Sequence, residues 1–290
     1  MIEEFEVSGP DAGPYGITTG PDGALWFTMA KAGQIGRFQP GGSLTVFDLD
    51  PASNPTVITL GPDGALWFTE YKGHRIGRIT AHGEITEFAI PTAEAEPYGI
   101  TTGADGALWF TLINLDRIGR ITPDGEITEF PLPVSGSFPG MITAGPDDGL
   151  WFSMNQANSI ARIDLGGDVT VHPLPTPAAA PVGICDGGDA GLWFVEIGAG
   201  QVGRIAVDGH VDEFPLPDKN CRPHAIVADD EGSLWFTEWG ANKVGRITLA
   251  GKIDEYSLPT PNSEPHGITI GPDGAAWVAL ENGKLARITA

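Results

Sequence analysis

Hydrophobic and polar residues alternate in short runs along the chain, and glycine- or proline-containing turns separate these runs. Residues 15–28, YGITTGPDGALWFT, contain two such runs on either side of a Pro-Asp-Gly turn. Alternation with a period of two is typical of a half-buried β-strand, so this segment predicts a hairpin. RIGRI-like and ITEF-like segments follow in each unit and predict two further strands. One unit therefore contains four antiparallel strands.

Seven of the eight tryptophans recur at a nearly constant interval, which reveals an internal repeat. The interval is 41 residues once and 42 residues five times, and a proline stands twelve residues before each tryptophan. An arginine follows each tryptophan by ten or eleven residues. A repeat of about 40–45 residues with several short strands is typical of β-propeller blades. We interpret the repeated tryptophans and arginines as structural, and the tryptophans are Trp26, Trp67, Trp109, Trp151, Trp193, Trp235 and Trp277.

The outermost strands of the repeats show how the ring closes. ITEF-like segments occur at 44–47, 85–88, 127–130, 169–172, 211–214 and 253–256, and the seventh copy is IEEF at 2–5. The last repeat, in contrast, stops after its third strand, LARITA. We expect the N-terminal strand to complete the last blade, because this pairing removes two exposed sheet edges. The prediction is an all-β, seven-bladed β-propeller with four antiparallel strands per blade, formed as a single domain by residues 1–290.

The repeats differ from one another at one rim of the predicted disc. The residue after each repeated proline enters the innermost strand at this rim, and the seven copies read Tyr15, Thr56, Tyr98, Gly140, Val182, His224 and His266. Histidine occurs there only in the last two blades. Glu264 lies two residues before His266, and residues two apart in a strand point to the same side. Glu70, Glu96 and Glu196 have no clustered partner, and we expect them to be solvated charges of this rim.

The last blade also brings two acidic residues into register. If the GPDG turn at 271–274 is a two-residue hairpin loop, Glu264 lies opposite Glu281, with Cβ atoms about 4.5–5.5 Å apart. Two carboxylates at this distance repel unless a cation or a shared proton lies between them. Oxygen ligands without cysteine favour Mg²⁺ or Ca²⁺ over zinc, and a neighbouring histidine suits a general base near neutral pH. The candidate site is Tyr15, His224, Glu264, His266 and Glu281, with Glu238, Trp239 and Lys284 as further candidates.

Composition and charge limit the classes of binding partner that the protein can have. The net charge is −22, which disfavours nucleic acid and anionic membrane surfaces because both require Lys and Arg. The segment MIEEFEVSGP lacks the features of a secretory signal, and no apolar run approaches the roughly 18–20 residues of a membrane span. Cys185 and Cys221 have no metal-like spacing, which suits a reducing compartment. We therefore expect a cytoplasmic monomer without nucleic-acid or membrane partners.

The repeats GPDGALWFTE, IGRIT and GEITEFPLP, together with RPHAI (222–226), SEPHGI (263–268) and ALENGKL (279–285), resemble the virginiamycin B lyase family, the streptogramin B lyases. The resemblance covers essentially the whole chain. It implies a Mg²⁺-dependent lyase that linearises type B streptogramins, which are cyclic depsipeptide antibiotics, by elimination at the threonyl ester and so confers resistance. It further implies that His266 is the general base, that Glu264 and Glu281 are Mg²⁺ ligands, and that His224 and Tyr15 contact the substrate.

Two other functions remain open from the residues alone. A lactonase-type hydrolase with Ca²⁺ on the axis would need carboxylate and amide ligands from several blades, and the candidates Asn54, Glu96 and Asn155 are scattered. A non-catalytic propeller would use the same rim to bind a peptide or a piece of cell wall. The repeat itself does not separate these functions, because many unrelated propellers share it.

Overall fold

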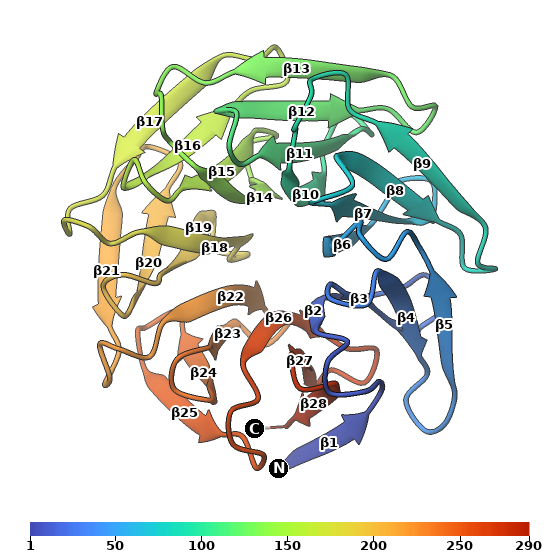
Figure 1. Cartoon of the computed structure of the whole chain (residues 1–290). Helices are drawn as coiled ribbons and strands as arrows, with labels where there is room; N and C mark the ends of the chain where they lie inside the picture. The colour runs from blue at the N-terminus through green and yellow to red at the C-terminus, as the bar shows by residue number, and fades with distance from the viewer. Residues whose placement is uncertain (290) are drawn as a thin grey trace.

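The computed structural model describes residues 1–289, which form seven four-stranded antiparallel sheets arranged in a ring (Figure 1). Each sheet is one blade, and the blades follow one another around the ring in chain order. The prediction of an all-β, seven-bladed propeller is confirmed. No helix within this part of the chain is long and apolar enough to cross a membrane.

Each blade runs from an innermost strand beside the axis to an outermost strand at the edge of the disc (Figure 1). The innermost strands all begin at the repeated proline: β2 (Pro14–Thr19), β6 (Pro55–Leu60), β10 (Pro97–Thr102), β14 (Pro139–Ala144), β18 (Pro181–Asp186), β22 (Pro223–Ala228) and β26 (Pro265–Ile270). The second strands carry the tryptophans: β3 (Leu25–Met29), β7 (Leu66–Glu70), β11 (Leu108–Leu112), β15 (Leu150–Met154), β19 (Gly191–Glu196), β23 (Ser233–Glu238) and β27 (Ala276–Leu280).

The outermost strand of each blade is its least buried strand. The third strands are β4 (Gln34–Phe38), β8 (Arg75–Ile79), β12 (Arg117–Ile121), β16 (Ser159–Ile163), β20 (Gln201–Ala206), β24 (Lys243–Thr248) and β28 (Lys284–Ile288). The outermost strands are β5 (Leu44–Asp48), β9 (Ile85–Ala89), β13 (Ile127–Pro131), β17 (Val169–Pro173), β21 (Val211–Pro215), β25 (Ile253–Ser257) and β1 (Ile2–Glu6).

The N-terminal strand closes the ring as the repeat count predicts. β1 pairs antiparallel with β28, from Ile2 opposite Ile288 to Glu6 opposite Lys284, and the two chain ends lie side by side (Figure 1). The ring of Phe5 stacks on Trp277 of the same blade with 5.3 Å between centroids. This contact adds aromatic packing to the strand pairing, so the closure is both hydrogen-bonded and apolar.

An aspartate of the Pro-Asp-Gly turn joins the repeated tryptophan to the repeated arginine. In blade 2 the Trp67 indole donates to Asp63 Oδ1 at 3.0 Å, and Arg78 Nε donates to Asp63 Oδ2 at 2.7 Å. Equivalent bonds to an aspartate occur in all seven blades. The tryptophan is buried between blades, so its polar N–H needs this partner. The structural role predicted for the tryptophans and arginines is confirmed.

The hairpin of blade 7 differs from its prediction in one respect. Gly271 donates to Ala275 O at 2.8 Å, and Gly274 has a φ of 75°, so the loop holds three residues rather than two. A type I turn followed by a left-handed residue makes a three-residue loop with a bulge. The register then shifts back between Ile268 and Pro265, which pairs with Leu280. Two irregularities cancel, and Glu264 still lies opposite Glu281.

Candidate active site

The innermost strands begin at one rim of the disc, and a repeated hydroxyl positions their first residues. In blade 6 the Thr237 hydroxyl donates to the backbone carbonyl of His266 in blade 7 at 2.9 Å. Thr28, Thr69, Thr111 and Ser153 make the equivalent bond to the next blade. The backbone of His266 is therefore held by the neighbouring blade, and its side chain is only 10% exposed.

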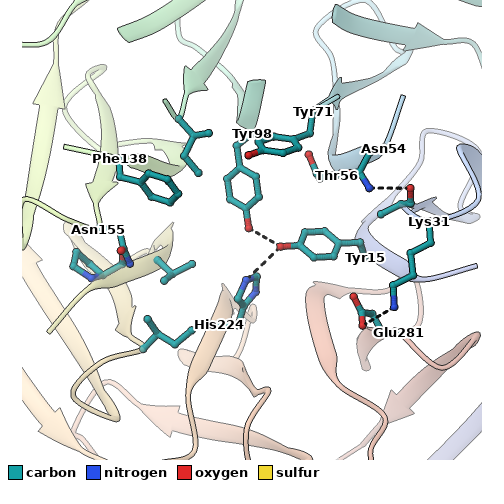
Figure 2. A pocket seen from close by; sticks show the side chains of 16 residues that line it. Tyr15, Lys31, Asn54, Thr56, Tyr71, Tyr98, Phe138, Asn155, His224 and Glu281 are labelled. Atoms are coloured by element: carbon teal, nitrogen blue, oxygen red, sulfur yellow. Dashed lines mark hydrogen bonds and ion pairs between the residues drawn. The ribbon is translucent and has the colours of Figure 1, made fainter. Parts of the chain in front are cut away.

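A cavity of about 550 Å³ opens at this rim around the axis (Figure 2). Six of the seven residues that follow the repeated prolines line it: Tyr15, Thr56, Tyr98, Gly140, Val182 and His224. Its wall is polar around Tyr15, His224 and Glu281, and more apolar on the side of Phe138 and Ile113. A pocket of this size with a few convergent polar groups is typical of small-molecule sites.

Aromatic rings from three adjacent blades pack around His266. The Tyr15 ring stacks on the His266 imidazole with 4.4 Å between centroids, and the His224 ring meets it edge-on at 4.8 Å. The Tyr15 hydroxyl lies 2.7 Å from the Tyr98 hydroxyl and 3.5 Å from His224 Nε2 (Figure 2). The rings of His224, His266 and Tyr15 therefore form one packed unit, and Tyr98 contacts this unit from across the axis through its hydroxyl.

Glu281 links this aromatic unit to the acidic pair. Its Oε1 lies 3.5 Å from His266 Nε2, and its Oε2 accepts from Lys31 Nζ at 3.1 Å. The backbone N–H of Glu281 donates to Glu264 O at 3.4 Å, which holds the two glutamates opposite each other. The structure thus brings together Tyr15, His224, Glu264, His266 and Glu281.

The electrostatics of this cluster follow from its contacts. Hydrogen bonding from His266, which outweighs burial, holds the pKa of the Glu281 carboxyl well below its usual range. The neighbouring Glu281 carboxyl, together with burial, raises the pKa of Glu264 above its usual range. Burial and the neighbouring His266 lower the pKa of His224 to about 3. His224 is therefore neutral at physiological pH and offers a hydrogen bond without a charge.

The opposed carboxyls fit a hard divalent cation. Two glutamates supply the oxygen ligands that Mg²⁺ prefers, and a cation between them would relieve the repulsion of the two carboxyls. Among residues 1–289, no group of three or more His, Cys, Asp or Glu side chains is arranged as a metal cage. Glu264 and Glu281 would therefore leave other coordination positions to water and substrate, which is usual for Mg²⁺.

Three further candidates lie apart from the acidic pair or at its edge. Lys284 Nζ binds Glu4 at 3.0 Å and the Thr260 hydroxyl at 2.9 Å, so it supports the closing strand β1 instead of the site. Glu238 is completely buried and points toward Lys243 and Glu255, away from the cavity. Only Trp239 is near, with its ring 6.3 Å from that of His266.

Two other glutamates are also buried, so their prediction as solvated rim charges is wrong. Glu70 and Glu196 are completely buried at the ends of β7 and β19, as Glu238 is at the end of β23. The same position holds the buried apolar residues Met29, Leu112, Met154 and Leu280 in the other blades. The apolar residues at this repeat position could have predicted the burial of the glutamates, because they mark the position as interior in every blade.

Lys31 is a site residue that the sequence did not reveal, and Tyr98, whose repeat position predicts a wall of the central cavity, lines the cavity and also contacts Tyr15. Lys31 reaches Glu281 from blade 1, across the closure, and Tyr98 reaches Tyr15 from blade 3. Tyr98 occupies the same repeat position as Tyr15, which was a usable signal, because equivalent residues face one another across a narrow axis. Lys31 carried no comparable signal, since the direction of an exposed lysine depends on its local partners.

Known proteins of similar sequence and structure are consistent with one family. A sequence profile described as the virginiamycin B lyase family matches residues 1–288. Virginiamycin B lyase of Saccharopolyspora erythraea is 63% identical over 52 residues, a segment that spans 18% of this chain and 17% of that enzyme. A solved streptogramin B lyase has 48% identity and a TM-score of 0.96, over 99% of this chain and 96% of that chain.

A second solved structure includes an antibiotic. It is a catalytically inactive His-to-Ala variant of virginiamycin B lyase from Staphylococcus aureus with quinupristin. It is 45% identical to this chain with a TM-score of 0.96, and the match covers 100% of this chain and 99% of that chain. Because the family profile spans nearly all residues and these structures match end to end, the chain belongs to the virginiamycin B lyase family.

Proposed function

We propose that this protein is a metal-dependent lyase that linearises type B streptogramins by elimination at their threonyl ester. The observation that carries the proposal is the arrangement of His266, which lies between the Tyr15 ring and the Glu281 carboxylate beside the opposed Glu264. The relative that was solved with quinupristin is inactivated by replacement of one histidine, which supports a histidine base in this family.

His266 is the general base of the proposed reaction. It would remove the proton from the threonine Cα, the electrons would form the Cα–Cβ double bond, and the Cβ–O bond would break to release a carboxylate. Glu281, 3.5 Å from the imidazole, would orient the ring and stabilise the imidazolium that results. The Tyr15 ring covers one face of the His266 imidazole, and the Tyr98 hydroxyl holds that of Tyr15. Together they would shield the base from water that competes for its proton-accepting nitrogen.

Glu264 and Glu281 would hold the cation, and His224 would contact the substrate. When bound, a divalent cation supplies Lewis-acid stabilisation of the negative charge that develops on the substrate oxygens. His224 stays neutral because burial depresses its pKa, so it can donate or accept one hydrogen bond at the wall of the cavity. The wall near Phe138 and Ile113 suits the apolar side chains of a cyclic depsipeptide.

The decisive experiment is incubation of the protein with quinupristin, with Mg²⁺ or with EDTA, followed by mass spectrometry. Elimination gives a linear product of unchanged mass that contains a dehydrated threonine, whereas hydrolysis adds one water. We expect the unchanged mass, loss of turnover in EDTA, and recovery on addition of Mg²⁺. His266→Ala should lower turnover by about 10²–10⁴-fold. His210→Ala, at an exposed histidine of the outer edge, is the matched control. A product heavier by one water would refute the elimination.

A further inference from the structure

Lys31 supplies the positive charge at the cavity wall. Among the described residues that line the cavity, it is the one lysine or arginine. Its Nζ lies 3.1 Å from Glu281 Oε2, and Figure 2 shows its side chain directed at that carboxylate. The side chain is 53% exposed and that of Glu281 is 20% exposed, so the ion pair stands at the edge of the site and can open toward water.

The repeat shows that this direction is particular to blade 1. Lys72 holds the equivalent position in blade 2, and its ammonium pairs forward with Glu96 of blade 3 at 2.5 Å. The forward position from Lys31 is Asn54, whose amide is already used in a hydrogen bond to Ala30 O. Lys31 therefore has no forward acid and turns back across the closure to blade 7.

Local packing supports the backward direction. The stem of Lys31 lies over Gly13, where a Cβ atom would be 3.0 Å from Lys31 Cγ. Gly13 has a φ of 66°, which a glycine adopts readily. The absence of a side chain at this residue leaves room for the lysine stem, so the ammonium is aimed at Glu281 by the shape of the rim as well as by charge.

We propose that the ammonium of Lys31 competes with the divalent cation for the carboxylate of Glu281. This inference rests on the proposed function, because it takes Glu264 and Glu281 as the metal ligands. The ammonium occupies Oε2 of Glu281 while no cation is bound, and it leaves that oxygen when one binds. An ammonium and a divalent cation repel each other at this separation, and the flexible lysine stem lets the charge swing into solvent. Lys31 thereby weakens cation binding while it keeps the carboxylate ordered.

Calorimetric titration of the purified protein with Mg²⁺ alone tests this inference. Lys31→Met keeps the aliphatic stem over Gly13 and removes the charge, and Lys72→Met removes the same charge from the equivalent position of blade 2. We expect Lys31→Met to bind Mg²⁺ about three- to tenfold more tightly than the parent at low salt, since a half-exposed charge is only partly screened. Lys72→Met should bind like the parent, and so should the charge-conserving Lys31→Arg.

The outcomes separate this inference from the proposed function. If the parent binds Mg²⁺ and Lys31→Met binds it equally or less tightly, Lys31 is not a competitor, although the metal site stands. If Lys72→Met tightens binding as much as Lys31→Met, the effect is one of net charge and the inference fails. If the parent shows no Mg²⁺ binding, the metal assignment of the proposed function fails first and the role of Lys31 fails with it. Thermal unfolding of each variant establishes that it is folded.

Discussion

The ring of Tyr15 stacks on the imidazole of His266 with 4.4 Å between centroids and 30° between the ring planes. The two residues belong to the first and last innermost strands, which are neighbours only because the ring closes. The orientation of the proposed base therefore depends on a residue from the opposite end of the chain. Tyr98 extends this dependence across the axis, because its hydroxyl lies 2.7 Å from that of Tyr15.

Substitutions at Tyr15 separate stacking from hydrogen bonding. Tyr15→Phe keeps the ring over His266 and loses the hydroxyl contacts to Tyr98 and, at 3.5 Å, to His224, so we expect kcat/KM to fall by about tenfold or less. Tyr15→Ala removes the stacking surface and should lower kcat/KM by a further order of magnitude or more. Steady-state kinetics with quinupristin measure both. Equal losses in the two variants would mean that the hydroxyl, rather than the ring, positions His266.

Buried glutamates make stability depend on pH near neutrality. Burial, aided by the charge of Glu255, raises the pKa of Glu238 to about 7. In the unfolded chain Glu238 ionises near its ordinary pKa, whereas in the folded chain it retains its proton up to about pH 7. The contribution of Glu238 to the free energy of unfolding is therefore greatest at low pH and falls as pH rises from about 4.5 through 7. Glu238→Gln is neutral throughout and should be more stable than the parent at pH 8 by about 1–3 kcal/mol, with little difference at pH 5.

Urea unfolding at the two pH values measures this difference. Glu126→Gln removes a carboxyl from an exposed turn and is the matched control, with an expected change within about 0.5 kcal/mol at either pH. A Glu238→Gln variant that is less stable than the parent at pH 8 would show that the ionised Glu238 gains more from Lys243 than it loses by burial.

Lys284 should matter for stability and not for turnover. Its ammonium joins Glu4 of the closing strand β1 to the Thr260 hydroxyl. Lys284→Met leaves the Glu4 carboxylate, whose side chain is mostly buried, without this partner, and we expect a loss of about 1–2 kcal/mol in urea unfolding. Turnover per folded molecule should stay at the parent value. A folded but inactive Lys284→Met protein would instead show that Lys284 acts in the active site, as its position in the sequence suggested.

Close packing between blades 7 and 1 requires a glycine beside the base. A Cβ atom at Gly267 would lie 2.5 Å from Tyr15 O and 3.1 Å from Gly16 Cα, both of which are backbone atoms that cannot move aside. Gly267→Ala should therefore cost about 1–3 kcal/mol and also disturb the stacking of Tyr15 on His266. Gly42→Ala, in open space, is the control with an effect within about 0.5 kcal/mol. Equal unfolding midpoints for both variants would contradict this account of the interface.

The fold was predictable because its determinants repeat. A tryptophan, a proline and an arginine at constant spacing define every blade, and one missing outer strand at the end of the chain identifies the closure. The opposition of Glu264 and Glu281 was also predicted, although from a hairpin loop one residue too short. The register survived because a shift between Pro265 and Ile268 offsets the extra loop residue.

Side-chain direction was the part that the sequence did not reveal. Glu238 ends a strand near the rim, yet its side chain points into the blade, because that position is interior in every repeat. Lys284 turns to Glu4 because the closing strand places an acid beside it. Tyr98 meets Tyr15 because the axis is narrow enough for blades 1 and 3 to touch across it. Each case depends on distances between segments far apart in sequence, which residue spacing does not contain.

The blade that carries Glu264, His266 and Glu281 is built from both ends of the chain, with β1 at its outer edge and β26, β27 and β28 inside. β1 is synthesised before all other strands of residues 1–289 and β28 after them, so this sheet cannot be completed until β28 has emerged. Blades 1 to 6 need no such wait, since each consists of consecutive strands. The chemistry proposed here therefore requires β1 and β28 together, and it cannot begin while the six earlier blades stand alone.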